Sequence, residues 1–114
     1  MIKGATLTIM VVDMDRSIDF YTKKLGFTLS NRWGDNYAEI DAAGMKIGIH
    51  PAIKEFPKSE NHISVGFLVD NLDRYAELLK TNSVQFTTDE DQALKFAFFS
   101  DPDGTPLYFG QMKW

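Results

Sequence analysis

Two stretches of this sequence follow the same plan: LTIMVVD at residues 7–13 and ISVGFLVD at residues 63–70. Each is an apolar, strand-like run that ends in an aspartate, and each precedes a segment with apolar residues at helical spacing. Further strand-like segments follow each helix. A period of about half the chain indicates two copies of one supersecondary unit. The repeat therefore predicts two facing sheets and directs the search for a binding site to the space between them.

The composition is that of one small domain without disulfides. The chain has 114 residues, no cysteine and a formal net charge of −4. The length suits a single domain with its own core, and the absence of cysteine excludes disulfides and thiolate ligands. The negative charge disfavours nucleic acid and anionic membranes, which recruit basic patches. Since no apolar stretch could span a bilayer and no signal-peptide pattern opens the chain, we expect a cytoplasmic protein.

The hydrophobic pattern predicts the order β-α-β-β-β twice, in an α+β fold. A first helix is expected over residues 14–25, capped by Asp13 or Asp15 and ended by Gly26, and a second over residues 71–80. Module one is expected at about residues 1–53, a linker at 54–60 and module two at 61–114, together forming a single domain with a cupped, paired mixed sheet. Strands are predicted at residues 5–12, 28–33, 36–41, 46–50, 62–69, 84–88, 94–100 and 106–112.

Alternation of side chains along the strands predicts that one face of each sheet is free of helices. In residues 62–69 one face carries only Ile and Val with a Phe, whereas the other is small or polar. The same contrast holds in the other strands, and such a second face fits a lined pocket better than it fits water. The ligand-binding residues expected there are Thr6, Trp33, Glu39, Gly48, His50, His62, Ser64, Phe98 and Tyr108.

Several motifs of this chain resemble those of the vicinal oxygen chelate superfamily, which holds the glyoxalase, bleomycin-resistance and extradiol-dioxygenase proteins. They are VVDMDRS at residues 11–17, FY at 20–21, LGF at 25–27, FLVDNLD at 67–73 and FSDPDG at 99–104. The motifs span nearly the whole chain in the right order. They are specific for the fold of that superfamily and not for one activity.

The resemblance also implies where a metal would be bound. The metal-dependent members place four ligands, typically His or Gln, Glu, His and Glu, on their first, fourth, fifth and eighth strands. Transferred to this chain, those positions fall on Thr6, Gly48, Ser64 and Tyr108. None of the four is a good ligand for a divalent metal. The resemblance therefore does not bring metal chemistry with it, and we expect no metal and no other cofactor.

Two histidines leave an alternative open. His50 and His62 each lie two residues from one of those positions, on the same face of the strand. Together with Glu39 they suggest a displaced metal site, although a partly solvated imidazole at a strand end is also ordinary. His50 and Glu39 are in addition the candidate catalytic residues, because an imidazole suits general acid–base work and a carboxylate can act as a base or anchor a cation.

The leading hypothesis is a metal-free, small-molecule-binding protein of the glyoxalase and bleomycin-resistance type. It would sequester or sense an aromatic or cationic compound in the cavity between the modules, with aromatic side chains such as Trp33 and Phe98 stacking on the ligand. The alternative is a metal-dependent lyase or isomerase resembling lactoylglutathione lyase, with the displaced site. A third possibility is a partner protein with a vestigial pocket. Homodimerisation is expected from the resemblance.

Overall fold

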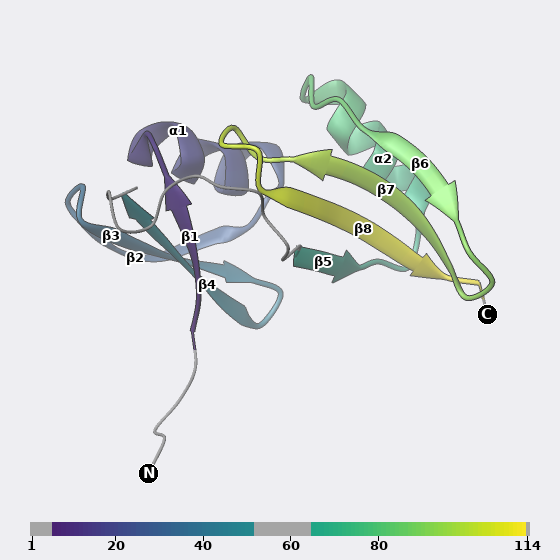
Figure 1. The fold of residues 1–114 in the computed structure, drawn as a ribbon, viewed down its shortest axis with the longest axis horizontal. Helices are drawn as coiled ribbons and strands as arrows, with labels where there is room; N and C mark the ends of the chain where they lie inside the picture. The colour runs from purple at the N-terminus through teal and green to yellow at the C-terminus, as the bar shows by residue number, and fades with distance from the viewer. Residues whose placement is uncertain (1–5, 52–64, 114) are drawn as a thin grey trace, which may run out of the picture. The chain divides into compact units, whose positions relative to one another are not determined.

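The computed structural model describes residues 6–51 and 65–113, which belong to two compact units, residues 1–59 and 60–114. Each unit has one helical segment and a four-stranded mixed sheet (Figure 1). The element order is β-α-β-β-β in both units. The fold is therefore α+β with two βαβββ modules in tandem, as the sequence predicts.

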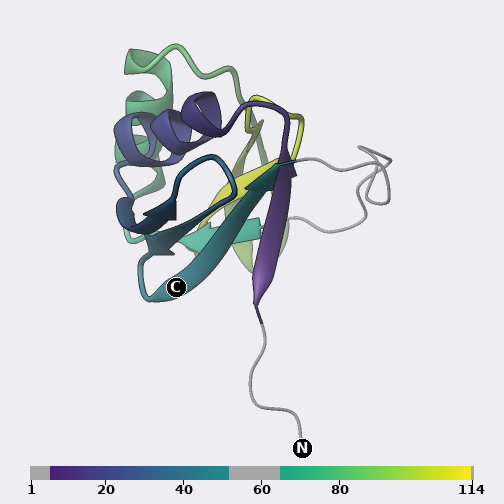
Figure 2. The ribbon, with the colours of Figure 1, turned by 90° about the vertical axis from the view of Figure 1, so that its left-hand side faces the viewer.

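The first unit builds its sheet in the order β1-β4-β3-β2. Strand β1 pairs in parallel with β4, whereas β3 pairs antiparallel with both β4 and β2. Figure 2 shows the helical segment lying to one side of these strands. The elements are β1 (Leu7–Val11), α1 (Met14–Asp19), the π-helical turn η1 (Phe20–Lys24), β2 (Thr28–Trp33), β3 (Tyr37–Ala42) and β4 (Met45–Pro51).

The second unit repeats this topology strand for strand. Its sheet has the order β5-β8-β7-β6, with β5 parallel to β8 and the other two pairs antiparallel. The register shows which residues are equivalent, because Thr8 lies opposite Gly48 in the first sheet and Gly66 lies opposite Tyr108 in the second. The elements are β5 (Val65–Leu68), α2 (Leu72–Thr81), β6 (Thr87–Glu90), β7 (Leu94–Ser100) and β8 (Pro106–Met112).

One face of each sheet is buried under its helix. In the first unit the apolar side chains of β1 and β4 are buried together with the stripe of α1 and η1, and in the second unit those of β5 and β8 are buried together with α2. Burial of such side chains contributes about 1.5–3 kcal/mol each, so these faces form the cores. The core residues on the strands include Ile9, Val11, Ile47, Ile49, Val65, Phe67, Leu107 and Phe109.

The helix termini confirm Asp13 as the first cap and show Asn71 to be the second. The Asp13 carboxylate accepts a hydrogen bond from the backbone N–H of Arg16 at 3.0 Å, and Asn71 at the equivalent position accepts one from Arg74 at 3.2 Å. Each satisfies an N–H group that the first turn would leave without a partner. Gly26 has a positive φ of 81°, as expected for the residue that ends a helix.

Two of the boundaries that differ from the sequence prediction have a clear cause in the hydrogen bonding. The first helix is α-helical only to Asp19 and continues as a π-helical turn, in which Leu25 N–H bonds to the Phe20 carbonyl at 3.1 Å. The hydroxyl of Thr22 donates to the Ile18 carbonyl at 2.7 Å and competes for the acceptor that an α-helix uses. Strand β6 starts later than predicted because Val84 N–H closes the end of α2.

Candidate functional site

The candidate site is the helix-free side of each sheet, here called its open face. On the first sheet, cross-strand pairs join Trp33 to Tyr37, and join Glu39 to both Asn31 and Gly48. Successive side chains point to opposite faces of a strand, so the register places all of these on the side away from α1. The open face of the first sheet carries Thr8, Met10, Asn31, Trp33, Tyr37, Glu39, Asp41, Lys46, Gly48 and His50.

The open face of the second sheet is aromatic and apolar. Phe98 lies opposite Tyr108, and Phe96 lies opposite Gly110. Thr87 of β6 lies opposite Phe98, and Gly66 of β5 lies opposite Tyr108, so these two residues belong to the cross-strand row of Phe98 and Tyr108. The full set on this face is Gly66, Leu68, Thr87, Asp89, Leu94, Phe96, Phe98, Ser100, Pro106, Tyr108, Gly110 and Met112.

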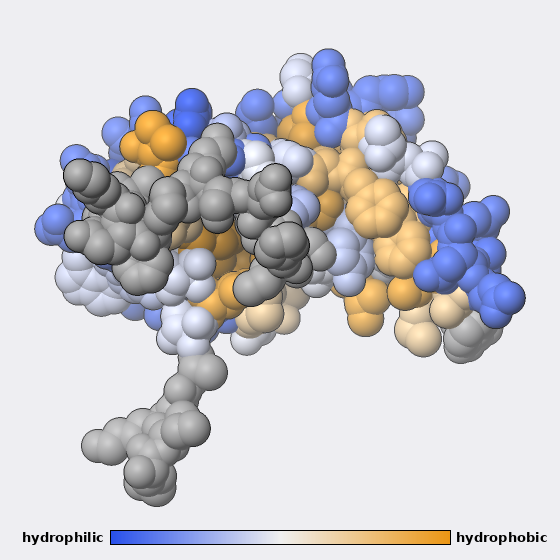
Figure 3. All heavy atoms as spheres, in the orientation of Figure 1, coloured by the Kyte–Doolittle hydropathy of each residue, from blue (hydrophilic) through white to orange (hydrophobic). Residues whose placement is uncertain are grey.

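Three rings form a cluster on the second open face. Phe96 and Phe98 stack with their centroids 5.1 Å apart and their planes 23° apart. Tyr108 meets Phe96 edge-on at 5.5 Å and lies 5.9 Å from Phe98. Phe98 is nevertheless 40% exposed and the neighbouring Leu68 is 70% exposed. Figure 3 shows the hydrophobic surface that gathers over β7 and β8 on this side.

A pocket of about 470 Å³ opens beside the cluster, within the second unit. This volume is within the usual range for small-molecule sites. Its walls combine the rings of Phe98 and Tyr108 with three hydroxyl groups, those of Thr87, Ser100 and Tyr108, that can orient a ligand. The lining residues are Thr87, Phe98, Phe99, Ser100, Pro106, Leu107 and Tyr108.

A tyrosine ring lies over a glycine in both sheets. A Cβ atom added to Gly66 would overlap the ring of Tyr108, and one added to Gly48 would overlap the Tyr37 hydroxyl and lie 2.9 Å from its Cζ. Real Cβ atoms do not approach other atoms so closely, so any side chain at either position would displace the ring. The two glycines therefore leave the space in which the rings lie against the sheet.

The ring of His50 is oriented by the backbone at the end of β4. Its Nδ1 lies 2.7 Å from the carbonyl oxygen of Pro51. Because a carbonyl oxygen only accepts, Nδ1 carries a proton and is the donor in this contact. The imidazole also contacts Tyr37, with centroids 6.4 Å apart, and Tyr37 in turn contacts Trp33 at 5.7 Å.

The first open face also carries charge. Lys46 Nζ lies 3.8 Å from Glu39 Oε1 and 3.6 Å from Asp41 Oδ2, and it donates to Ser30 Oγ at 3.1 Å. One ammonium group thus lies between two carboxylates. The side chain of Glu39 is 28% exposed, which places its carboxylate at the surface of the sheet and not in the core.

The structure brings together part of the predicted lining. Trp33, Glu39, Gly48 and His50 share the first open face, and Phe98 and Tyr108 share the second. Thr6 precedes β1 and is exposed, and Thr8 is the residue opposite Gly48. His62 and Ser64 lie outside the described residues, as does the 54–60 linker.

Among the residues of the first open face that the predicted lining left out, Tyr37 and Lys46 do most to shape it. Tyr37 covers Gly48, and Lys46 lies between the acidic side chains. Strand alternation would have found Tyr37, since it stands two residues before Glu39 and so shares its face. Lys46 likewise stands two residues before Gly48.

Two of the implied metal positions, Gly48 and Tyr108, do not fit a divalent ion. Gly48 offers no ligand atom, and the Tyr108 ring lies against Gly66 among its aromatic neighbours. In the part of the chain that the structure describes, no group of three or more His, Cys, Asp or Glu side chains could hold a metal ion. A divalent site normally needs three or four such ligands.

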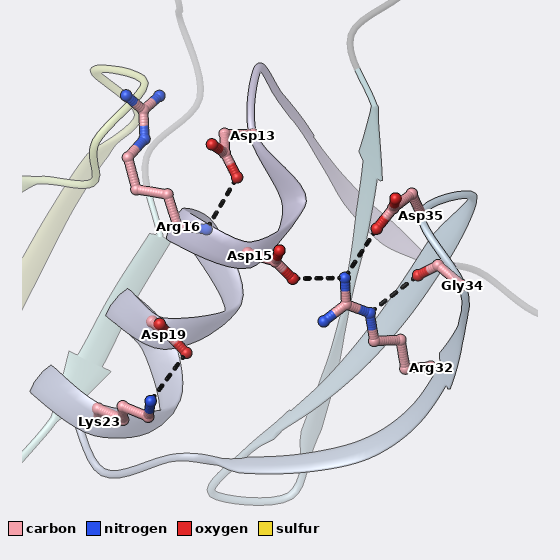
Figure 4. A network of polar contacts seen from close by, with 8 residues as sticks. All are labelled: Asp13, Asp15, Arg16, Asp19, Lys23, Arg32, Gly34 and Asp35. Carbon is pink, nitrogen blue, oxygen red and sulfur yellow. Dashed lines mark hydrogen bonds and ion pairs between the residues drawn. The ribbon is translucent and has the colours of Figure 1, made fainter.

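The acidic residues near α1 have a structural role in the first unit. Arg32 donates to Asp15 at 2.7 Å, to Asp35 at 2.9 Å and to the Gly34 carbonyl at 2.8 Å (Figure 4). These hydrogen bonds, with Asp15 first, raise the pKa of Arg32 above its ordinary value. Asp15 thus ties the start of α1 to the β2–β3 turn.

Comparison with known proteins identifies the family. The model of the Glyoxalase/Bleomycin resistance protein/Dioxygenase superfamily matches residues 5–109. The chain belongs to this superfamily. It is also 30% identical to the uncharacterized protein YurT of Bacillus subtilis strain 168, over 96% of this chain and 98% of that protein.

Two solved structures show how well this glyoxalase-type fold is preserved. A putative glyoxalase family protein from Bacillus anthracis has a TM-score of 0.81 at 16% identity, covering 99% of this chain and 98% of that one. TnmS3, an antibiotic binding protein from Streptomyces sp. CB03234, has a TM-score of 0.77 at 20% identity, covering 99% of both chains. At these identities the likeness establishes the fold alone.

Across the described residues, none of the helices has the length and apolar character that crossing a membrane requires.

Proposed function

We propose that this glyoxalase-superfamily chain binds a planar aromatic small molecule on the open face of its second sheet, and so sequesters or senses it. The observation that carries the proposal is the cluster of Phe96, Phe98 and Tyr108, which is partly exposed beside a pocket. Exposed rings on a rigid sheet offer stacking surface at little entropic cost. The hydroxyl groups of Thr87 and Tyr108 supply directional contacts there.

The similarity to TnmS3 supports the class of ligand. That protein is an antibiotic binding protein of the same fold. Binding without chemistry also agrees with the residues that stand at the implied ligand positions, because Gly48 and Tyr108 replace carboxylates. We therefore propose that the binding needs no metal, and that a chelator leaves it unchanged. The metal-dependent lyase or isomerase reading is not supported by any specific contact of the described residues.

Homodimer formation stays a prediction, which analytical ultracentrifugation would check.

Titration with 2-naphthol, a neutral planar probe, tests this function. We expect it to shift the backbone amide signals of Thr87, Phe98 and Tyr108 in nuclear magnetic resonance spectra. Phe98→Ala should weaken binding about 2- to 12-fold, the equivalent of one aromatic pair worth about 0.5–1.5 kcal/mol.

Leu29→Ala is the matched control, because Leu29 is 38% exposed against 40% for Phe98 but lies in the first unit. It should leave binding of the probe unchanged. Equal effects of the two substitutions, or shifts centred outside β6, β7 and β8, would contradict the proposed function. A loss of the probe's affinity on adding a chelator would contradict its metal-free form.

A further inference from the structure

We propose that the first sheet carries a second binding site, for a small organic cation such as an alkylammonium group. The site is the part of the first open face formed by Trp33, Tyr37, Glu39 and His50, here called the cation face. The site lies in the first unit alone and does not depend on aromatic binding at the second sheet. The two sites differ in chemistry, so each can be tested without the other.

The cation face offers aromatic rings to a ligand. Trp33 and Tyr37 have their centroids 5.7 Å apart and their planes inclined by 39°, and Trp33 is 53% exposed. His50 continues the row at 6.4 Å from Tyr37. Trp and Tyr rings attract cations through the negative potential of their faces, within about 6 Å of the ring centroid. An alkylammonium group buries its methyl groups against such rings and keeps its charge beside them.

The charges on this face are unequal. Lys46 lies between Glu39 and Asp41 at 3.8 and 3.6 Å, so within residues 6–51 the open face carries two carboxylates against one ammonium group. Asp41 is additionally occupied, because its Oδ1 accepts the Gly44 N–H at 2.9 Å. The Glu39 carboxylate makes a long ion pair, with its Oε1 3.8 Å from Lys46 Nζ. This carboxylate is therefore the anionic group that an incoming cation would meet beside the rings.

The internal repeat indicates that the fold does not require these charges. Glu39 lies opposite Gly48 in the first sheet, and Phe98 lies opposite Tyr108 at the equivalent place in the second. By the same register, Asp41 opposite Lys46 corresponds to Ser100 opposite Pro106. One backbone arrangement thus forms with a charged row in one unit and an uncharged row in the other. The charged row points to ligand recognition rather than to sheet stability.

Choline and its neutral carbon isostere, 3,3-dimethylbutan-1-ol, make a matched pair of probes, since they differ in the quaternary nitrogen. We expect choline to shift the amide signals of Tyr37, Glu39 and His50, with a dissociation constant on the order of millimolar. The isostere should bind at least several-fold more weakly. Equal binding of the two probes, or shifts that avoid β3 and β4, would overturn the inference.

Two substitutions should act in opposite directions. Glu39→Gln should weaken choline binding about fivefold, because it removes the carboxylate and keeps its shape. Lys46→Gln should strengthen it, since it removes the cation that competes for Glu39. A gain in affinity cannot result from unfolding, so the pair separates recognition from damage to the fold.

The control is Glu77→Gln on α2, which makes the same charge change at an exposed residue of the other unit. It should leave choline binding unchanged, as should Phe98→Ala. If Glu39→Gln and Glu77→Gln weakened choline binding equally, the loss would come from the change in net charge alone, and the proposed cation site would be refuted. A failure of 2-naphthol binding with choline binding intact would refute the proposed function and leave this inference standing.

Discussion

Gly66→Ala tests whether the Tyr108 ring lies where the structure places it. The new methyl group would overlap Cζ and Cε2 of Tyr108, so the ring must swing away from the sheet. Gly66 has no positive φ, and its strand accepts an alanine backbone. The cost therefore comes from the ring and not from backbone strain.

The magnitude follows from the contacts that Tyr108 makes. It pairs with Phe96 at 5.5 Å and with Phe98 at 5.9 Å, and each aromatic pair is worth about 0.5–1.5 kcal/mol. Losing both would cost about 1–3 kcal/mol of unfolding free energy. Replacing a strand glycine by alanine returns about 0.5–1 kcal/mol. The single substitution should therefore destabilise by about 0–2.5 kcal/mol, a range too wide to be decisive alone.

A double-mutant cycle with Tyr108→Ala isolates the effect. Once the ring is removed, Gly66→Ala should be neutral or stabilising, which gives a coupling free energy of about 1–3 kcal/mol between the two positions. Urea denaturation followed by circular dichroism measures all four proteins, with constant m-values as the check on two-state unfolding. A coupling below about 0.5 kcal/mol would refute the reasoning. Gly110→Ala is the control, because its Cβ would lie at an ordinary 3.6 Å from the same ring.

Two further predictions concern the second unit. Asn71→Ala should lower the unfolding free energy by about 0.5–2 kcal/mol in urea denaturation, because the Arg74 N–H loses its cap, whereas Asn71→Asp should not. The hydrogen bond from Lys113 lowers the pKa of Glu90, and backbone N–H groups lower that of Asp91. A carboxylate whose pKa is lowered in the folded state stabilises the fold fully at pH values above its ordinary pKa, which is 4.5 for Glu90 and 3.8 for Asp91. This contribution is lost as the pH falls through the lowered pKa of the folded state. The urea midpoint should thus fall between pH 6 and pH 3, and less so in Lys113→Met; an unchanged fall in that variant would contradict the Glu90 pairing.

Much of the fold was readable because its signals are local. Period-two alternation located all eight strands, and apolar stripes located both helical segments. Asp13 and Gly26 marked the limits of the first helix through cap chemistry and positive φ. The boundaries that failed depend on competition for a single acceptor. The Thr22 hydroxyl and the Val84 N–H each take a carbonyl that a regular pattern assigns elsewhere, and periodicity does not register such competition.

The sequence indicated which face of each sheet carries the candidate site, but not how the side chains on that face are arranged. Parity along a strand indicates which side a residue occupies, and so it grouped Glu39 with His50 and Phe98 with Tyr108. It does not give the side-chain torsions that lay Tyr37 and Tyr108 over glycines. Those depend on neighbours from other strands, and on the absence of a Cβ atom beneath the ring.

The tyrosine–glycine pairs show how one repeated unit presents two different surfaces. In the first sheet the ring from β3 covers a glycine of β4, and in the second the ring from β8 covers a glycine of β5. Gly48 and Tyr108 are at equivalent positions, so one unit has no side chain where the other has a large one. Both arrangements place a ring close to a position at which the resemblance implies a metal ligand. The ring in the first unit has charged neighbours, whereas the ring in the second has aromatic ones. The proposed preference of the first open face for a cation, and of the second for a planar ring, follows from these neighbours and not from the shared backbone.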